Sequence, residues 1–280
     1  MKHSDRKAGN IAVFIFLTIF GIFMIFPIYL AFVMAFKPEQ ELFVFPPKLY
    51  TLNPTPDNFR NMLRDLSNSQ LVSFSRYFFN SFFVTISVTV FQCMFSAMAG
   101  FVLAKCNFKG KKILNAVIVV SLLYQSNVIY IMQYSLIAEM NMINTYRALI
   151  FPLIASPMSL FLMRQSISQV PDEIIEAGKI DGANLFRICW NIVMPNQKPA
   201  LATVMIFAFQ SAWNMQSGSF IYDENLKTLP TVIQQLTASG ISKTGISASA
   251  SVIMLLPPVI IFIFARKSVI KTMAHSGISG

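Results

Sequence analysis

The chain has 280 residues, of which 55% are hydrophobic and only 12% are charged. This composition excludes an ordinary soluble domain and predicts an all-α integral membrane protein, because helices satisfy their own backbone hydrogen bonds in lipid. The formal net charge is +10. In a membrane protein such an excess reflects basic residues beside the spans, and no nucleic-acid partner is expected.

A membrane-spanning helix needs roughly 20 apolar residues. Six spans are predicted in chain order, and together they form a single transmembrane domain of residues 1–280. They cover approximately residues 11–36, 78–104, 113–137, 147–165, 199–220 and 246–266. Loops at 37–77, 138–146 and 221–245 are predicted on one side of the membrane, and the hydrophilic segment 166–198 lies on the other side.

The distribution of basic residues predicts the orientation of these spans. Most of the 22 Lys and Arg residues fall at the two termini, in the turn after the second span and in segment 166–198. Because basic residues next to spans stay in the cytoplasm, both termini and segment 166–198 are predicted to be cytoplasmic and the three loops external. The prolines of the first external loop favour an extended strap over a packed helix; they are Pro38, Pro46, Pro47, Pro54 and Pro56.

The sequence offers little catalytic chemistry. No charged residue lies in the core of a predicted span, whereas ion-coupled carriers usually bury at least one. Histidine occurs only as His3 and His275, and the Gly-Lys-Ser/Thr of a phosphate-binding loop is missing. We therefore expect neither a metal site nor enzyme activity. An ion-coupled secondary transporter and a non-transporting membrane scaffold remain as alternative interpretations.

Small residues recur at intervals of four in the second span, as Ser96, Gly100 and Ala104. On a helix this spacing places them on one face. A face without bulky side chains allows another backbone to approach closely, which is a main source of helix association in lipid. The pattern predicts close packing of another helix against this part of the span.

Residues 171–195, called the knuckle below, have a helix-turn-helix pattern. Pro171 suits a first helical turn, and the two acidic residues after it favour the positive end of a helix dipole. The first helix is predicted to run to about residue 181, where Gly182 permits the turn into a second helix at 183–193, closed by Pro195. Ala177 and Gly178 have little side-chain bulk, which would let this helix insert closely into a groove on a partner. Glu176 offers a carboxylate that an arginine can hold. A surface loop merely punctuated by Gly and Pro is the alternative.

The knuckle resembles the cytoplasmic coupling loop of binding-protein-dependent ABC importer permeases. The resemblance to the carbohydrate class, typified by the inner-membrane subunits of maltose importers, extends over nearly the whole chain. It is carried by residues 36–38, 57–60, 142–146, 213–214, 228–230 and 256–258. The sequence departs from the family pattern at three positions: Gly178 replaces a second alanine, Met194 replaces a leucine, and Met215 stands where an acidic residue is usual.

The resemblance implies a type I ABC importer permease fold with a cytoplasmic coupling helix, in a bacterial or archaeal cell membrane. It implies a second homologous permease, two ATP-binding subunits that carry the ATP and Mg²⁺, and an extracytoplasmic solute-binding protein. This chain would then hold no cofactor. The solute would be a sugar or oligosaccharide, with glycerol phosphate esters as a neighbouring class. The implied ATPase-coupling residues are Glu173, Glu176, Ala177, Gly178, Asp181, Gly182, Ala183 and Pro195.

Polar and aromatic residues inside the apolar spans are candidates for the substrate pathway, since sugars bind through hydroxyl hydrogen bonds and aromatic faces. They are Asn80, Gln92, Tyr124, Gln125, Asn127, Tyr130, Gln133, Gln210, Trp213 and Asn214. Hydrogen bonding between helices explains such residues equally well. The resemblance also places contact with the solute-binding protein in the third external loop. The mixed charges of that loop favour a wet, reversible contact over a buried core.

Overall fold

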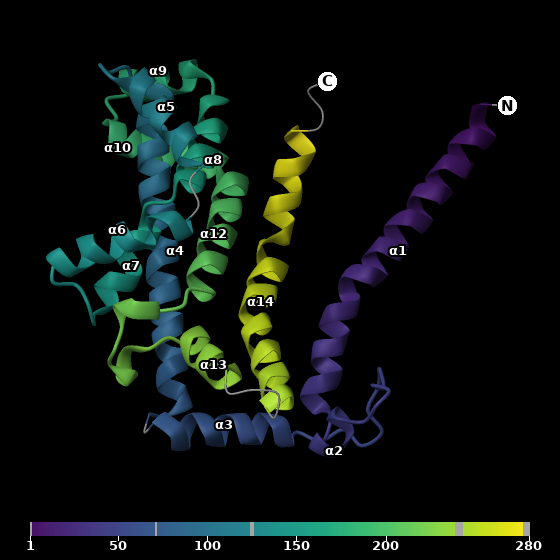
Figure 1. The fold of residues 1–280 in the computed structure, drawn as a ribbon. Helices are drawn as coiled ribbons and strands as arrows, with labels where there is room; N and C mark the ends of the chain where they lie inside the picture. The colour runs from purple at the N-terminus through teal and green to yellow at the C-terminus, as the bar shows by residue number, and fades with distance from the viewer. Residues whose placement is uncertain (1, 71, 124–125, 239–242, 277–280) are drawn as a thin grey trace. The chain divides into compact units, whose positions relative to one another are not determined.

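The computed structural model describes residues 2–70, 72–123, 126–238 and 243–276, and these residues form helices and connecting loops without a strand. Figure 1 shows the helices in chain order. The chain divides into two compact units. Unit 1 contains residues 1–71 and 233–256, and unit 2 contains residues 72–232 and 257–280. The chain passes between the units after residue 71 and again inside two helices, α13 (Leu229–Thr237) and α14 (Thr244–Ser276).

Four helices in the described part of the chain are long and apolar enough to cross a membrane. They comprise Val13–Phe36, Phe74–Lys105, Tyr146–Ser168 and Thr244–Phe264. The other two predicted spans correspond to shorter helices. Residues 113–137 fall on α5 (Lys111–Ser121) and α6 (Ser126–Glu139), and residues 199–220 begin with α12 (Lys198–Trp213), which has 16 residues. The all-helical membrane architecture is thus as predicted, with four clear spans rather than six.

Unit 1 is built around the end of α1 (Lys2–Phe36). A short helix, α2 (Glu39–Leu42), follows it, and α3 (Asp57–Gln70) lies further along the chain. The buried Asn58 of α3 donates its amide hydrogens to the carbonyls of Ala35 (3.0 Å) and Lys37 (2.7 Å). These carbonyls lie at and just beyond the end of α1, where backbone acceptors lack a helical partner. Asn58 therefore caps α1 from a distance in sequence.

The segment between α1 and α3 agrees only in part with the predicted strap. Up to Pro56 it is irregular apart from α2, and it is held by Lys37, whose ammonium donates to the carbonyl of Lys48 at 2.9 Å. After Pro56 the chain forms the 14-residue helix α3, which the strap prediction missed. The apolar residues Met62 and Leu66 lie one helical turn apart and are buried, so an amphipathic face rather than proline content decides this part.

Unit 2 is organised around α4 (Phe74–Lys105), against which α8 (Pro157–Ser168), α12 and α7 (Tyr146–Ile154) pack. A Cβ added to Gly100 would lie 2.9 Å from the Met163 Cβ and 3.0 Å from the Arg164 backbone nitrogen. The backbones of α4 and α8 therefore meet at Gly100, and the close approach predicted from the small-residue face is confirmed there. One apolar cluster of unit 2 includes Phe101, Met163 and Val204.

Candidate functional site

The first half of the knuckle has the conformation that the sequence indicated. Helix α9 (Asp172–Ile180) begins after Pro171, and Asp181 is its C-cap. Gly182 has φ +76°, in the left-handed region that favours glycine. The backbone N–H groups of Gly182 and Ala183 donate to the carbonyls of Lys179 and Gly178, both at 3.0 Å. These two bonds form a Schellman motif, which ends the helix and redirects the chain.

The second half of the knuckle differs from the single predicted helix. Asn184 caps a short helix, α10 (Leu185–Arg187), by accepting a hydrogen bond from the Arg187 backbone at 2.8 Å. A π-helical segment, η1 (Ile188–Val193), follows, and then α11 (Met194–Asn196). Pro195 was expected to close a helix, but it lies in α11, which directly continues η1. The chain then continues into α12.

Gly178 serves a contact inside the knuckle. It is buried, and a Cβ at this position would lie 2.8 Å from Ile192 Cδ1 and 3.3 Å from Ile188 Cγ1. The missing side chain therefore lets α9 pack on η1 within the same chain, and not only against a groove on a partner, as was expected. The neighbouring Ala177 is exposed.

An exposed face remains on the outside of the knuckle. The exposed predicted residues are Glu173, Glu176, Ala177, Asp181, Gly182 and Pro195, and Ala183 is half-buried. Three large apolar side chains that the sequence analysis did not select join this face: Ile180 is 86% exposed, Phe186 62% and Leu185 50%. Their position on both sides of the Gly182 turn could have predicted this exposure, because the helices on either side are short and offer little surface to cover them. Carboxylates and apolar groups are thus presented together.

Lys105 fixes the start of the knuckle to the end of α4. Its side chain is only 7% exposed, and its ammonium donates to the Asp172 carboxylate at 2.8 Å and to the backbone carbonyl of Val170. The hydrogen bond from Lys105, and then its charge, hold the pKa of the Asp172 carboxyl below its ordinary value, and Lys111 and Lys179 act in the same direction. The first turn of α9 is therefore tied to α4 by a charge-assisted bond.

Several predicted pathway residues have structural partners. Asn80 is fully buried and donates to the carbonyls of Asn225 (2.8 Å) and Lys227 (2.9 Å), while its own carbonyl accepts from the Tyr146 hydroxyl at 2.7 Å. Gln92 is also buried and donates to the Ser159 hydroxyl. The side chains of Tyr124, Gln125 and Asn127 lie outside the described residues.

Aromatic packing holds two further candidates. Trp213 is fully buried and stacks on Phe209, with ring centroids 6.0 Å apart. Tyr130 packs against Phe220 at 5.1 Å, and its hydroxyl accepts from the Ser219 backbone at 3.1 Å. Of the last three candidates, Gln133 is half-buried, and Gln210 and Asn214 are exposed. The structure thus does not gather the candidates into one site.

The loop after α12 is packed rather than wet over much of its length. The hydroxyl groups of Ser217 and Thr231 lie 2.6 Å apart, and Thr228 adds a third buried hydroxyl 3.0 Å from that of Thr231. The Leu229 backbone donates to the Ser81 hydroxyl at 2.7 Å. The expectation of a solvated loop is wrong for residues 227–233, which are buried, because their polar groups find partners in the protein instead of water.

Comparison with known proteins gives a consistent result. No protein-family model matches the chain. Over 283 residues it is 28% identical to the arabinooligosaccharides transport system permease protein AraQ of Bacillus subtilis (strain 168), covering 100% of both chains. It is 29% identical over 257 residues to the sn-glycerol-3-phosphate transport system permease protein UgpE of Escherichia coli O1:K1 / APEC, covering 90% of this chain and 92% of that protein.

The fold agrees with these relatives. A chain from the crystal structure of a bacterial ABC transporter involved in the import of the acidic polysaccharide alginate superimposes with a TM-score of 0.78. The superposition covers 94% of this chain and 97% of that chain at 19% sequence identity. This protein is a binding-protein-dependent ABC importer permease. As a permease subunit it is not itself an ATPase.

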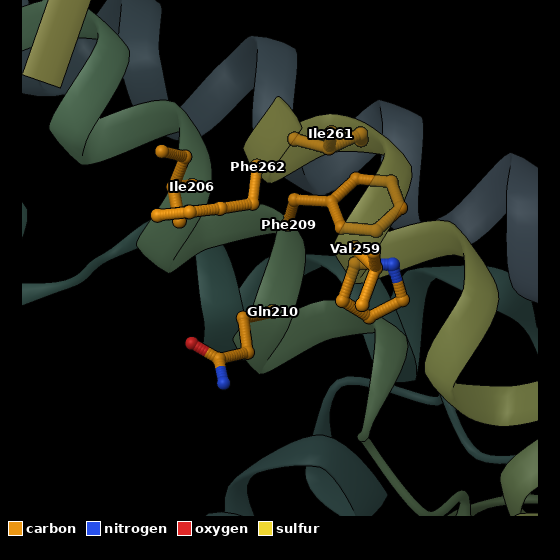
Figure 2. A pocket seen from close by; sticks show the side chains of 7 residues that line it. Ile206, Phe209, Gln210, Val259, Ile261 and Phe262 are labelled. Carbon is orange, nitrogen blue, oxygen red and sulfur yellow. The ribbon is translucent and has the colours of Figure 1, made fainter. Parts of the chain in front are cut away.

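The permease also has an apolar pocket within unit 2. It is lined by α12 and the middle of α14, and Gln210 is its polar member (Figure 2). In Figure 2 the Gln210 amide points away from Phe209 and Val259. The remaining lining residues are Ile206, Phe209, Pro258, Val259, Ile261 and Phe262. With one polar group directed elsewhere, the pocket has few groups that could orient a polar solute.

Proposed function

We propose that this permease imports a sugar or oligosaccharide as one of two homologous permease subunits. Two ATP-binding subunits dock on the cytoplasmic side, and an extracytoplasmic solute-binding protein delivers the solute. The names of the relatives support this solute class, since AraQ belongs to an arabinooligosaccharides transport system and UgpE to an sn-glycerol-3-phosphate transport system. An oligosaccharide is the first choice and a glycerol phosphate ester the second.

The observation that carries the proposal is the outer face of the knuckle. Glu173 and Glu176 are exposed on α9, and the apolar side chains of Ile180, Leu185 and Phe186 are exposed in the same knuckle. Ile180 follows Glu176 by four residues, which places the two on one face of α9. Apolar groups of this size are seldom left in water beside carboxylates unless they meet a partner. The knuckle is therefore the coupling site, and closure of the ATPases moves it. No covalent chemistry is required of the permease.

The proposed orientation places both termini and the knuckle in the cytoplasm of a bacterial cell. The residues on the substrate pathway would then come from the accessible candidates Tyr130, Gln133, Gln210 and Asn214. Asn80, Gln92 and Trp213 support the pathway from behind, because their polar or aromatic groups are already engaged. Two pairs of labels test the orientation. Single cysteines at 110 and 185 should react only from the cytoplasm, and those at 60 and 235 only from outside.

Transport in proteoliposomes tests the coupling site. The full complex is reconstituted with its solute-binding protein, and ATP hydrolysis and uptake are measured with an arabinooligosaccharide and with glycerol 3-phosphate. Glu176→Ala and Phe186→Ala should each weaken ATPase docking about tenfold or more, since losing a charged hydrogen bond or a buried aromatic contact costs about 1.5–3 kcal/mol or more. Asn196→Ala, also exposed near the knuckle, is the matched control.

The outcomes separate the competing functions. Solute-stimulated ATP turnover that both variants reduce supports an ABC importer with this coupling site. Uptake driven by an ion gradient without ATP would instead indicate a secondary transporter, and assembly without any uptake would indicate a scaffold. Normal ATPase docking in both variants would refute the assignment of the knuckle.

A further inference from the structure

Helix α4 is held at both of its ends by side chains that reach other segments of unit 2. It contains 32 residues, which corresponds to about 48 Å at 1.5 Å per residue. Its sequence has no proline, whereas α1 contains Pro27 and α14 contains Pro257 and Pro258. Because proline is the commonest cause of a sharp kink, α4 is the long helix best suited to act as a stiff rod.

At one end of α4, Lys105 binds the knuckle. Its ammonium donates to the Asp172 carboxylate and to backbone carbonyls of Ser168 and Val170, where α8 ends and α9 begins. The neighbouring Lys111 donates to the carbonyls of Ala104 (3.2 Å) and Cys106 (3.0 Å), which closes the end of α4 itself. Figure 1 shows α9 and α10 beside this end of α4. Displacement of α9 therefore pulls directly on α4.

At the other end, α4 holds residues 225–229 of the loop after α12. Asn80 bonds the carbonyls of Asn225 and Lys227, and Ser81 accepts from the Leu229 backbone. Arg76 adds a third tie through its Nε, which donates to the Asn225 carbonyl at 3.2 Å. Asn80 and Ser81 are buried, so water does not compete for these bonds. A displacement of this loop must also displace the end of α4.

Between its ends, α4 is packed tightly enough to transmit motion. Its backbone touches α8 at Gly100, as described above, and α12 packs along it as well. Close-packed protein interiors have low compressibility and transmit strain. From Asn80 to Lys105 the helix covers roughly 38 Å at the rise of an α-helix.

We propose that α4 is the mechanical link between the loop after α12 and the knuckle, with Asn80 and Lys105 as the positioning residues at its two ends. This inference rests on the proposed function, in which the knuckle faces the ATPases, and on the expectation from the family resemblance that the loop after α12 contacts the solute-binding protein. Docking of the binding protein then biases α4, and α4 biases the coupling helix. By linkage, ATPase closure biases the loop to the same degree.

A double-mutant cycle on the reconstituted complex tests the link. The measured quantity is the stimulation of ATP hydrolysis by the loaded binding protein, taken as the ratio to hydrolysis without it. Lys105→Met and Asn80→Leu each remove the hydrogen-bonding group at similar size, and each should lower the stimulation about tenfold, as expected for lost charged or buried hydrogen bonds. Because the hydrogen bonds at the two ends of α4 act in series, the double variant should lose no more stimulation than the single variant with the larger loss.

Matched controls separate the link from general damage. Lys112→Met removes an exposed lysine one residue from Lys111, and Tyr77→Phe removes a hydroxyl on α4 that has no hydrogen-bond partner among the described residues. Both should retain full stimulation. If the first pair of variants fails to assemble, Asp172→Asn and Tyr146→Phe remove one bond at each end and enter the same cycle.

The cycle has distinct outcomes. Effects at sites this far apart normally combine independently, so fold losses that multiply in the double variant would overturn the link while leaving the proposed function intact. Full stimulation in either single variant would also overturn it. A wild-type complex whose ATP hydrolysis does not respond to the binding protein would overturn the proposed function and the link together.

Discussion

The contact at Gly100 predicts a specific cost for adding one methyl group. In Gly100→Ala the new Cβ would lie 2.9 Å from the Met163 Cβ, about 0.5 Å inside the 3.4 Å at which ordinary contact begins. The Arg164 backbone nitrogen, at 3.0 Å, cannot rotate away as a flexible side chain can. The helices must therefore separate, and overpacking of this kind typically costs about 1–3 kcal/mol.

Gly21→Ala is the matched control for this substitution. Gly21 also lies inside a helix, but nothing is within 4 Å of a Cβ built there. Both substitutions gain the same helix propensity, of about 1 kcal/mol, so their difference isolates the packing cost. We expect Gly100→Ala to be less stable than Gly21→Ala by about 1–3 kcal/mol in the free energy of unfolding. Helical circular dichroism during titration of mixed micelles with SDS measures this difference, and equal stability would refute the close approach of α4 and α8.

Two further predictions concern other parts of the chain. Asn58→Ala leaves carbonyls at the end of α1 without their buried donor and should cost about 1–3 kcal/mol in the same titration, whereas an unchanged midpoint would contradict the capping role. Burial raises the pKa of the Cys189 thiol to about 11, so the reactive thiolate should be scarce at neutral pH. In a variant with Cys93→Ser and Cys106→Ser, alkylation of Cys189 should be slow at pH 7 and accelerate as the pH rises towards that pKa, and fast labelling at neutral pH would argue against burial.

The sequence predicts structure well where the signals are local. Helix α9 and its end follow from a proline, an acidic first turn and a glycine within about a dozen residues, and Gly182 has the left-handed conformation that its role requires. Long apolar runs likewise predict α1, α4 and α14. The predicted spans at 113–137 and 199–220 are not confirmed, because the first falls on two helices, α5 and α6, and α12 has only 16 residues.

Features that depend on distant partners were not predictable. Residues 227–233 carry the charge and hydroxyl groups of a solvated loop, yet they are buried. Asn80 and Ser81, almost 150 positions earlier in the chain, bond the backbone of Lys227 and Leu229, and Ser217 pairs with the Thr231 hydroxyl. The π-helical segment η1 has no sequence signature of its own, and its packing depends on the space that Gly178 leaves on another helix. The same reason explains why Asn80 looked like a solute ligand: an amide in an apolar span does not reveal its partner.

The exposure of α1 affects which substitutions this permease tolerates during evolution. The most apolar stretch of α1, within Val13–Phe36, buries none of its residues against the rest of the chain. Lipid accepts Leu, Ile, Val and Phe almost interchangeably, so selection there acts on total hydropathy and not on shape. At Gly100 one additional carbon is already too much. The sequence of α1 should therefore vary widely among related permeases, whereas the glycine at the crossing of α4 and α8 should be retained. The longest helix would then show the lowest sequence identity between relatives.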